Sequence, residues 1–403
     1  MYMRYIAIIT MLIGFQSCVK NVNDSFNPYD RPEDSTIIAI PIEIPFDLEK
    51  DKFSEAVRFC YSDIFSNVDY IKLSDTQDIS LGSIDKFEVL KDESIVVLDR
   101  TNGCICRFDS VGHFLNQIGQ RGHAGDEYIT AEDFQYDYFN EEIVINDRNS
   151  GALKIYDLDG RYKRSLTLGL YFSSFGVISK DYYVVNMDYS ESPEEGETSY
   201  NLKIIDRNGD VVKELVPYTS SEHQNFVWEE MFKNSNGVLI CNDYCSSLLF
   251  TFIGLETKPM YYLDFEENMI PNKIRSSREA NIGKKVICRK FYETDSYFIL
   301  LLEQKSMLLT CIIDKQNLSK SFIKLKGYND VKGIVGRQLF SYVHNNKIYY
   351  IFDPYEIQGF LDNIDNERAK IERRNGNVTP QDIELLKDLS KNVNPIIQIC
   401  TMK

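Results

Sequence analysis

The stretch EEIVINDRNSGALKIYDLDGRYKRSL, residues Glu141–Leu166, decides the fold of this 403-residue chain. It begins with a β-branched run at Ile143–Ile145, and such side chains suit a pleated, half-buried surface. Polar residues and Gly151 interrupt the run, and a second apolar run ends at the turn Asp157–Gly160. Glycine supplies the backbone freedom that this kind of turn needs. The stretch therefore predicts three short strands separated by two turns.

The same Asp-x-x-Gly turn recurs at Asp109–Gly112 and at Asp206–Gly209. The three final glycines are 48 and 49 residues apart, and Gly254 follows 45 residues later in a degenerate copy. A fixed period of this length, with about four short strands in each repeat, is typical of the blades of a β-propeller. We predict an all-β, six-bladed β-propeller with middle strands near 94–109, 141–157, 181–206, 237–253, 296–313 and 346–352.

The sixth blade lacks its outer strands in chain order, and the two ends of the domain can supply them. The run Pro395–Met402 can add one strand, and Val68–Leu73 can add the last. A ring closed in this way leaves no open sheet edge. We therefore expect residues 36–403 to form one propeller that is closed by N- and C-terminal strands.

A small helical insertion, at about 356–391, interrupts the sixth blade. Thr379 and Pro380 are typical of a helix start, with Thr379 as the N-cap and proline at the first helical position. The helix that follows carries an apolar stripe, which we expect to pack against the propeller rather than against a partner. The stripe consists of Ile383, Leu385, Leu386 and Leu389.

The N-terminus predicts export. Residues 1–17 carry Arg4 and then an apolar run that is too short to span a bilayer but fits a signal peptide. The run ends at Ser17-Cys18, which is similar to a lipobox, so Cys18 is the expected lipidation site and the membrane is the expected partner. An ordinary secretory signal followed by a chance cysteine is the alternative. Residues 18–35 are polar and contain two prolines, which predicts a flexible tether.

Charge and cysteine content narrow the possible partners. Without residues 1–17 the chain keeps 44 Lys and Arg against 61 Asp and Glu, a balance of −17 that disfavours nucleic acid as a partner. Eight cysteines remain besides Cys18, and no Cys-x-x-Cys pair occurs. Most lie in apolar runs, and we expect them to be small buried hydrophobic residues, although a disulfide or two is possible. Cys104 and Cys106 are two apart and share one face of a strand.

The connection after the first blade, residues 118–128, contains Gly119, Gly122 and Gly125. Arg121 and His123 lie between these glycines and could hold an anion. A simple blade-to-blade connection that needs glycine backbone angles explains the same residues. No helix follows the glycines, so the loop lacks the context of a nucleotide-phosphate site.

Three segments together resemble a known family. They are the lead-in SDIF…VDYIKL at residues 62–73, the glycine loop at 118–128 and the ending Asn394–Ile397. They look like the six-bladed β-propeller lipoproteins of gut Bacteroidetes, which are similar to NHL-repeat propellers. The likeness covers roughly residues 60–403, but the loop has His123-Ala124-Gly125-Asp126 where the family usually has Gly-Pro-Gly-Glu. The resemblance implies a propeller fold and an envelope location, and no particular activity.

An acidic residue ends or follows the second strand of every predicted blade. In a propeller these acids share one end of the ring, where they could hold Ca²⁺, a cation that prefers oxygen ligands. An aspartate at a strand end also accepts hydrogen bonds from its own turn, which explains the pattern without a metal. The six residues are Asp99, Asp147, Asp188, Asp243, Glu303 and Asp353.

The sequence contains no catalytic motif, neither a Gly-x-Ser-x-Gly elbow nor a His-x-x-x-His pair. We therefore predict a binding or scaffolding module of the cell envelope, without a cofactor, whose ligand is an unknown glycan, peptide or protein. The alternative is a calcium-dependent hydrolase, lactonase or lyase that uses the six acids. The predicted ligand-binding face comprises Asp99, Arg100, Arg121, His123, Asp147 and Arg148.

Overall fold

The computed structural model describes residues 37–42, 60–74, 80–219, 231–235, 238–243, 246–268, 285–304, 307–318, 320–323, 329–332, 340–373 and 377–403. The expected signal peptide (1–17), the tether (18–35) and Cys18 lie outside these ranges.

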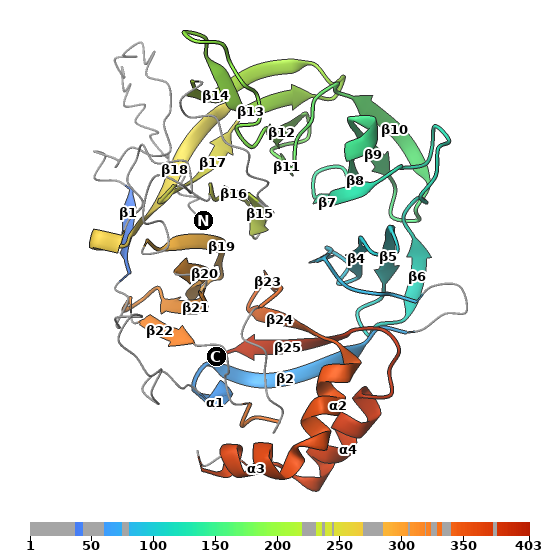
Figure 1. The fold of residues 1–403 in the computed structure, drawn as a ribbon, viewed down its shortest axis with the longest axis vertical. Coiled ribbons are helices and arrows are strands. Elements are labelled where there is room, and N and C mark those ends of the chain that lie inside the picture. The colour runs from blue at the N-terminus through green and yellow to red at the C-terminus, as the bar shows by residue number, and fades with distance from the viewer. Residues whose placement is uncertain are drawn as a thin grey trace, which may run out of the picture.

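Six β-sheets stand around a common centre, as Figure 1 shows, which confirms the predicted six-bladed propeller. The first three blades are each made from one continuous segment of antiparallel strands. Blade 1 contains β3 (Lys86–Val89), β4 (Ile95–Asp99), β5 (Cys104–Phe108) and β6 (Phe114–Gln117). Blade 2 contains β7 (Ala131–Asp137), β8 (Glu142–Asp147), β9 (Ala152–Tyr156) and β10 (Tyr162–Thr167). Blade 3 contains β11 (Ser174–Val177), β12 (Tyr182–Asn186), β13 (Ser199–Asp206) and β14 (Val211–Tyr218).

Blades 4 and 5 repeat this order, and blade 4 gains a fifth strand from the N-terminal region. Blade 4 contains β15 (Phe232–Ser235), β16 (Val238–Cys241), β17 (Leu248–Ile253) and β18 (Glu256–Asp264). The additional strand, β1 (Ile38–Pro41), pairs in parallel with β18 at the rim of the ring (Figure 1). Blade 5 contains β19 (Ile287–Glu293), β20 (Tyr297–Gln304), β21 (Met307–Asp314) and β22 (Lys320–Ile323).

Blade 6 is built from both ends of the domain, as the sequence predicts. Its first two strands are β23 (Tyr342–His344) and β24 (Lys347–Phe352), and its third is β25 (Ile396–Met402). The outer strand is β2 (Phe65–Lys72), which follows the short helix α1 (Tyr61–Ile64) and pairs antiparallel with β25. Ile71 lies opposite Ile397 in this pair. The pairing closes the ring and completes blade 6 as a four-stranded sheet.

The blades bury both faces of their middle strands, which explains the continuous apolar runs in the sequence. Ile143 and Ile145 of β8 pack with residues of blade 1, whereas Val144 packs with residues of blade 3. All three side chains are fully buried. Burying an isoleucine or valine side chain stabilises the fold by about 1.5–3 kcal/mol. The side faces of the blades, rather than a central apolar plug, therefore supply much of the core.

The repeated glycine turns set the distance between neighbouring blades. Gly160 has φ +82°, and a Cβ placed on it would lie 2.0 Å from the carbonyl oxygen of Gln117 in blade 1. Gly112 has φ +97°, and its Cβ would lie 2.3 Å from the carbonyl oxygen of Lys72 in blade 6. Only glycine permits both the backbone angle and the close approach. At these two positions the motif thus marks a contact between blades as well as a turn.

Three helices fill the insertion in blade 6, whereas the sequence predicts only the last one. They are α2 (Pro354–Asp362), α3 (Ile364–Glu372) and α4 (Pro380–Leu389). Thr379 caps α4 by accepting a hydrogen bond from the backbone N–H of Asp382, as expected. Leu386 and Leu389 are buried in the cluster that also contains residues of blade 6, so the stripe does pack against the propeller. Among the described residues, no helix has the length and apolar character needed to cross a bilayer.

Candidate functional site

The predicted ligand face lies on the side of the ring where the second strand of each blade ends. We call this side the top face. Strands alternate in direction within each antiparallel blade, so the second strand ends beside the connection that leads into the first strand. The turns between the third and fourth strands, such as Asp157–Gly160, lie on the opposite side.

Two acids of the top face act as loop anchors. Asp99 is fully buried, and its carboxylate accepts hydrogen bonds from the backbone N–H groups of Gly82 (2.6 Å) and Asn102 (3.0 Å). It thereby ties the connection into β3 to the turn that follows β4. The carboxylate is buried, so these donors offset the cost of removing its charge from water.

Asp147 does the same in blade 2. It is fully buried and accepts from the N–H groups of Ile129 (3.1 Å) and Thr130 (2.9 Å), and from the hydroxyl of Ser150 (2.7 Å). The equivalent acid of two successive blades thus fastens the equivalent loop. The pattern that suggested a ring of metal ligands has this structural role in blades 1 and 2.

The other four acids also have partners of their own. Asp188 accepts from the side-chain amide of Asn186 (2.8 Å), and Asp243 accepts from the hydroxyl of Tyr189 (2.8 Å). Glu303 forms an ion pair with Arg289. Asp353 caps α2 by accepting from the N–H of Tyr355 (2.8 Å).

No metal cluster is evident within the described ranges. In them, no group of three or more His, Cys, Asp or Glu side chains is placed to hold a metal ion. The calcium alternative therefore stays a prediction.

The arginines of the face, in contrast, come together. Arg100 of blade 1 donates from Nε to the carbonyl oxygen of Glu132 in β7 (2.9 Å). Arg148 of blade 2 lies 3.7 Å from the carboxylate of the same Glu132, and 44% of its side chain is exposed. Two arginines that are far apart in the sequence thus converge on one residue at the boundary between blades 1 and 2, Arg100 on its backbone carbonyl and Arg148 on its carboxylate. Sequence reasoning missed Glu132, because nothing in its local pattern shows which loops it meets.

Arg121 lies beside this group. A Cβ placed on Gly103 would lie 3.0 Å from Cδ of Arg121, so the arginine passes over the turn that follows Arg100. The side chain of Arg121 is exposed. Arg100, Arg121 and Arg148, with Glu132, form what we call the arginine cluster.

His123 belongs to a loop that closes on itself. The carboxylate of Glu127 accepts from the N–H of Ala124 (2.9 Å) and from the side-chain amide of Gln120 (2.5 Å). These donors, with the backbone of His123, hold the pKa of Glu127 below its usual value. A Cβ on Gly122 would lie 1.8 Å from the same carboxylate. Glu127 therefore occupies the position that an external anion would take, which favours the connection over the anion-holding interpretation.

A second polar group, which the sequence did not predict, lies between the inner strands of blades 1 and 2. Nζ of Lys86 is 2.7 Å from the carboxylate of Asp133 and 3.5 Å from that of Glu88. All three side chains are buried, and burial raises the pKa of Glu88, which the charge of Lys86 only partly offsets. Such a buried group specifies how two blades fit together more than it adds stability.

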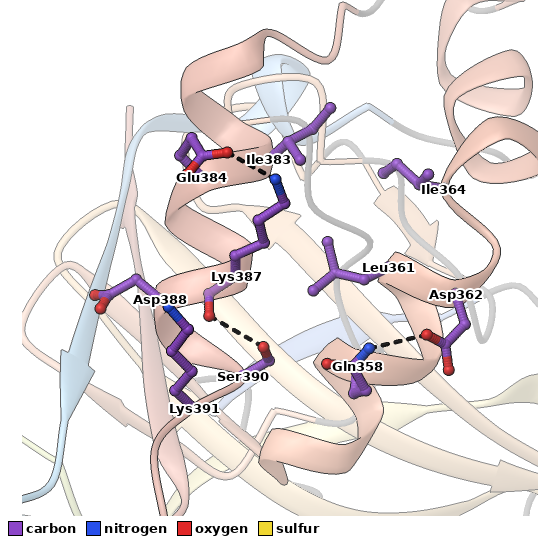
Figure 2. A pocket seen from close by; sticks show the side chains of 10 residues that line it. All are labelled: Gln358, Leu361, Asp362, Ile364, Ile383, Glu384, Lys387, Asp388, Ser390 and Lys391. Carbon is purple, nitrogen blue, oxygen red and sulfur yellow. Dashed lines mark hydrogen bonds and ion pairs between the residues drawn. The ribbon is translucent and has the colours of Figure 1, made fainter.

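The helical insertion carries a groove, shown in Figure 2. The groove, of about 680 Å³, runs between α2 and α4. Leu361 and Ile383 extend into the space between the helices, and charged side chains such as Lys387 and Glu384 border it (Figure 2). Lys387 and Glu384 are paired with each other at 2.7 Å. The groove is amphipathic and offers no arrangement of catalytic groups.

Residues 43–401 match the model of a protein family described as a domain of unknown function, DUF4934. The chain belongs to this family. No curated protein matches the chain. The family match fits the Bacteroidetes propeller resemblance drawn from the sequence.

Solved structures share the fold. A putative exported protein from Bacteroides fragilis is 14% identical with a TM-score of 0.65, and the match covers 91% of this chain and 99% of that one. A member of the DUF4221 family from Bacteroides vulgatus is 9% identical with a TM-score of 0.48, covering 84% of this chain and 97% of that one. A virginiamycin B lyase from Staphylococcus aureus is 7% identical with a TM-score of 0.39, covering 70% and 94% respectively. At such identities the first of these likenesses shows the propeller fold alone.

Proposed function

We propose that this member of the DUF4934 family is a cell-envelope lipoprotein that is anchored through Cys18 to the outer membrane. Its propeller acts as a binding or scaffolding module, and its ligand binds on the top face. The propeller fold and the predicted signal peptide support this function. The ligand is a glycan, peptide or protein that carries acidic groups.

The observation that carries the proposal is that the acids of the top face hold its loops, whereas the arginines are exposed to solvent. Asp99 and Asp147 are buried and accept hydrogen bonds from the loops beneath the face. Arg121 and Arg148 are exposed on the loops that these acids fasten or adjoin. A guanidinium group offers a rigid fork of donors that matches a carboxylate, and rigid placement reduces the entropy cost of binding. The arrangement is a preorganised cationic patch on a chain whose total charge is negative.

The test is an array of acidic and neutral glycans and peptides, probed with the full mature chain carrying Cys18→Ser so that it stays in solution. We expect binding to an acidic member of the array, and loss of at least tenfold in affinity in Arg148→Gln. Arg161→Gln is the matched control, because Arg161 is also exposed but directly follows the Asp157–Gly160 turn on the opposite side. Equal losses in the two variants would contradict the proposed face.

The anchor is tested separately. In a host that processes lipoproteins, the wild-type chain should sediment with membranes, and Cys18→Ser should release it into the soluble fraction. Release of the wild-type chain without lipid would contradict anchoring. It would not bear on the proposed ligand face.

Melting temperature with Ca²⁺ and with EDTA distinguishes the module from a calcium enzyme. A cation that binds only the folded state must raise the melting temperature. We expect no difference, because Asp99 and Asp147 are committed to loop donors. A rise with Ca²⁺ that disappears in Asp147→Asn would favour the calcium-dependent hydrolase or lyase instead.

A further inference from the structure

Two thiols of blade 1 lie within reach of each other. The sulfur atoms of Cys104 and Cys106 are 3.8 Å apart, and both residues belong to β5. Cys106 is fully buried, whereas Cys104 is half-buried at the start of the strand. Neither cysteine of the pair forms a disulfide in the structure. This pair therefore differs from a lone buried cysteine, because a second thiol is placed to react with the first.

We propose that Cys104 and Cys106 form a reversible redox pair, which cycles between two thiols and an intrastrand disulfide by exchange with a disulfide-bearing partner molecule. Cys104 attacks the partner disulfide, forms a mixed disulfide and releases one thiol of the partner. Cys106 then attacks the sulfur of Cys104 and releases the second thiol. Two protein thiols and one partner disulfide become one protein disulfide and two partner thiols, so electrons and protons balance.

The surroundings assign the two roles. Cys104 can meet a reagent from solution, and Cys106 cannot, so Cys104 is the attacking thiol and Cys106 the resolving one. The S–H of Cys106 donates to the sulfur of Cys104, which lowers the pKa of Cys104 and raises that of Cys106. Thiolate is the reactive form, so the shift favours the same assignment.

Disulfide formation requires one of the two cysteines to shift, and the backbone permits this shift only at the start of β5, where Cys104 lies. Cys106 pairs with strands on both sides, with Val97 in β4 and Gln117 in β6. Cys104 pairs with Asp99 in β4 but lies beyond the last paired residue of β6. Gly103, with a left-handed backbone at φ +65°, directly precedes it at the end of a turn. Cys104 can thus shift toward Cys106 while the inner strands keep their register.

The geometry also predicts that the disulfide is easily reduced. Residues two apart on a strand have Cα atoms separated by about 6.6 Å, at the upper limit for a disulfide. A bond formed there strains the strand, and strained or exposed disulfides are the labile ones. The pair is therefore a reversible modification site rather than a structural crosslink.

Trypsin gives a direct readout, since cleavage after Arg100 and Arg107 releases both cysteines in one peptide, Thr101–Arg107. The full mature chain carrying Cys18→Ser is equilibrated with reduced and oxidised glutathione, quenched with acid, alkylated and measured by mass spectrometry. We expect the peptide to lose two hydrogen atoms and its alkylation in oxidised glutathione, and to regain both in reduced glutathione.

Two variants test the roles. Cys106→Ala should trap one glutathione on Cys104, whereas Cys104→Ser should leave Cys106 unmodified in the folded chain. Circular dichroism confirms that each variant is folded, and Cys106→Ala preserves the apolar character of the buried position. Two persistent thiols in the wild type, a stable glutathione adduct on wild-type Cys104, or a disulfide that reduced glutathione leaves intact would each overturn the proposal.

Discussion

Blades 2 and 6 reach the same four-stranded sheet by different routes. Blade 2 uses one continuous segment, residues 131–167, in which each strand follows the last through a short turn. Blade 6 takes two strands from 342–352, a third from the C-terminus and the outer one from β2. Its strand pairs β24–β25 and β25–β2 are nevertheless as regular as those of blade 2. The comparison teaches that a propeller can substitute chain ends for turns, so that its stability depends on a contact between distant residues.

The largest effect should come from the third strand of each blade. Ile155 in β9 and Ile397 in β25 are both fully buried. Changing either to alanine should cost about 3–4 kcal/mol of unfolding free energy, from lost burial and the cavity left behind. Urea unfolding, followed by two spectroscopic probes, measures both. A much smaller loss for Ile397→Ala, with transitions that do not coincide, would show that the composite blade opens by itself.

The glycine turns sharpen the comparison at the contacts between blades. Gly160→Ala and Gly112→Ala should each cost about 3 kcal/mol, from the left-handed backbone and the clash with a neighbouring carbonyl. Gly254→Ala is the matched control. It also has positive φ, at +60°, but a Cβ there would meet nothing within 4 Å. It should cost only about 1 kcal/mol. Equal losses at all three positions would mean that the blade contacts add nothing to the backbone effect.

The acids at the ends of the second strands should differ between the two blades. Asp147→Ala in blade 2 removes the acceptor of three donors and should cost about 2–3 kcal/mol. Asp353→Ala in blade 6 removes a helix N-cap and should cost about 1 kcal/mol. Thermal and urea unfolding of both variants provide the values. The reverse order would contradict the loop-anchor role of Asp147.

The smallest expected effect is on the pH dependence of stability. It concerns β3 of blade 1, which lies between blade 6 and blade 2. Phe87 packs against Tyr342 and Tyr349 of blade 6, whereas Lys86 and Glu88 face blade 2. The folded state raises the pKa of Glu88, so it binds a proton more readily than the unfolded chain does. Stability must therefore fall as pH rises from the ordinary glutamate pKa through the raised one.

Glu88→Gln removes this dependence and keeps an acceptor for the N–H of Tyr136. Relative to the variant, the wild type should lose unfolding free energy between about pH 5 and about pH 8. Urea unfolding of both proteins at the two pH values measures the difference. A relative gain of the wild type with rising pH would contradict the buried, desolvated position of Glu88.

The sequence predicted what depends on local pattern and period. The spacing of Gly112, Gly160 and Gly209 indicated the blades, because each glycine must fill the same turn. The apolar terminal runs indicated the closing strands, because the sixth blade otherwise lacked two. The cap at Thr379 indicated α4 for the same local reason.

Contacts between distant segments could not be predicted in this way. The parallel pairing of β1 with β18 joins residues more than 200 positions apart, and its sequence holds no turn or period that points to blade 4. Glu132 and the pair of Lys86 with Asp133 depend on how two blades stack. The acids of the second strands were found, but whether a carboxylate meets loop N–H groups or a cation is decided by loop geometry.

Native-state hydrogen exchange of the unmodified fold tests the closed ring most directly. If the chain ends share one cooperative blade, the amides of Ile71 and Ile397 should exchange only through global unfolding, with the same free energy as those of Val144 and Ile155. Exchange of the β2 and β25 amides at a clearly lower free energy, while blade 2 stays protected, would contradict the account.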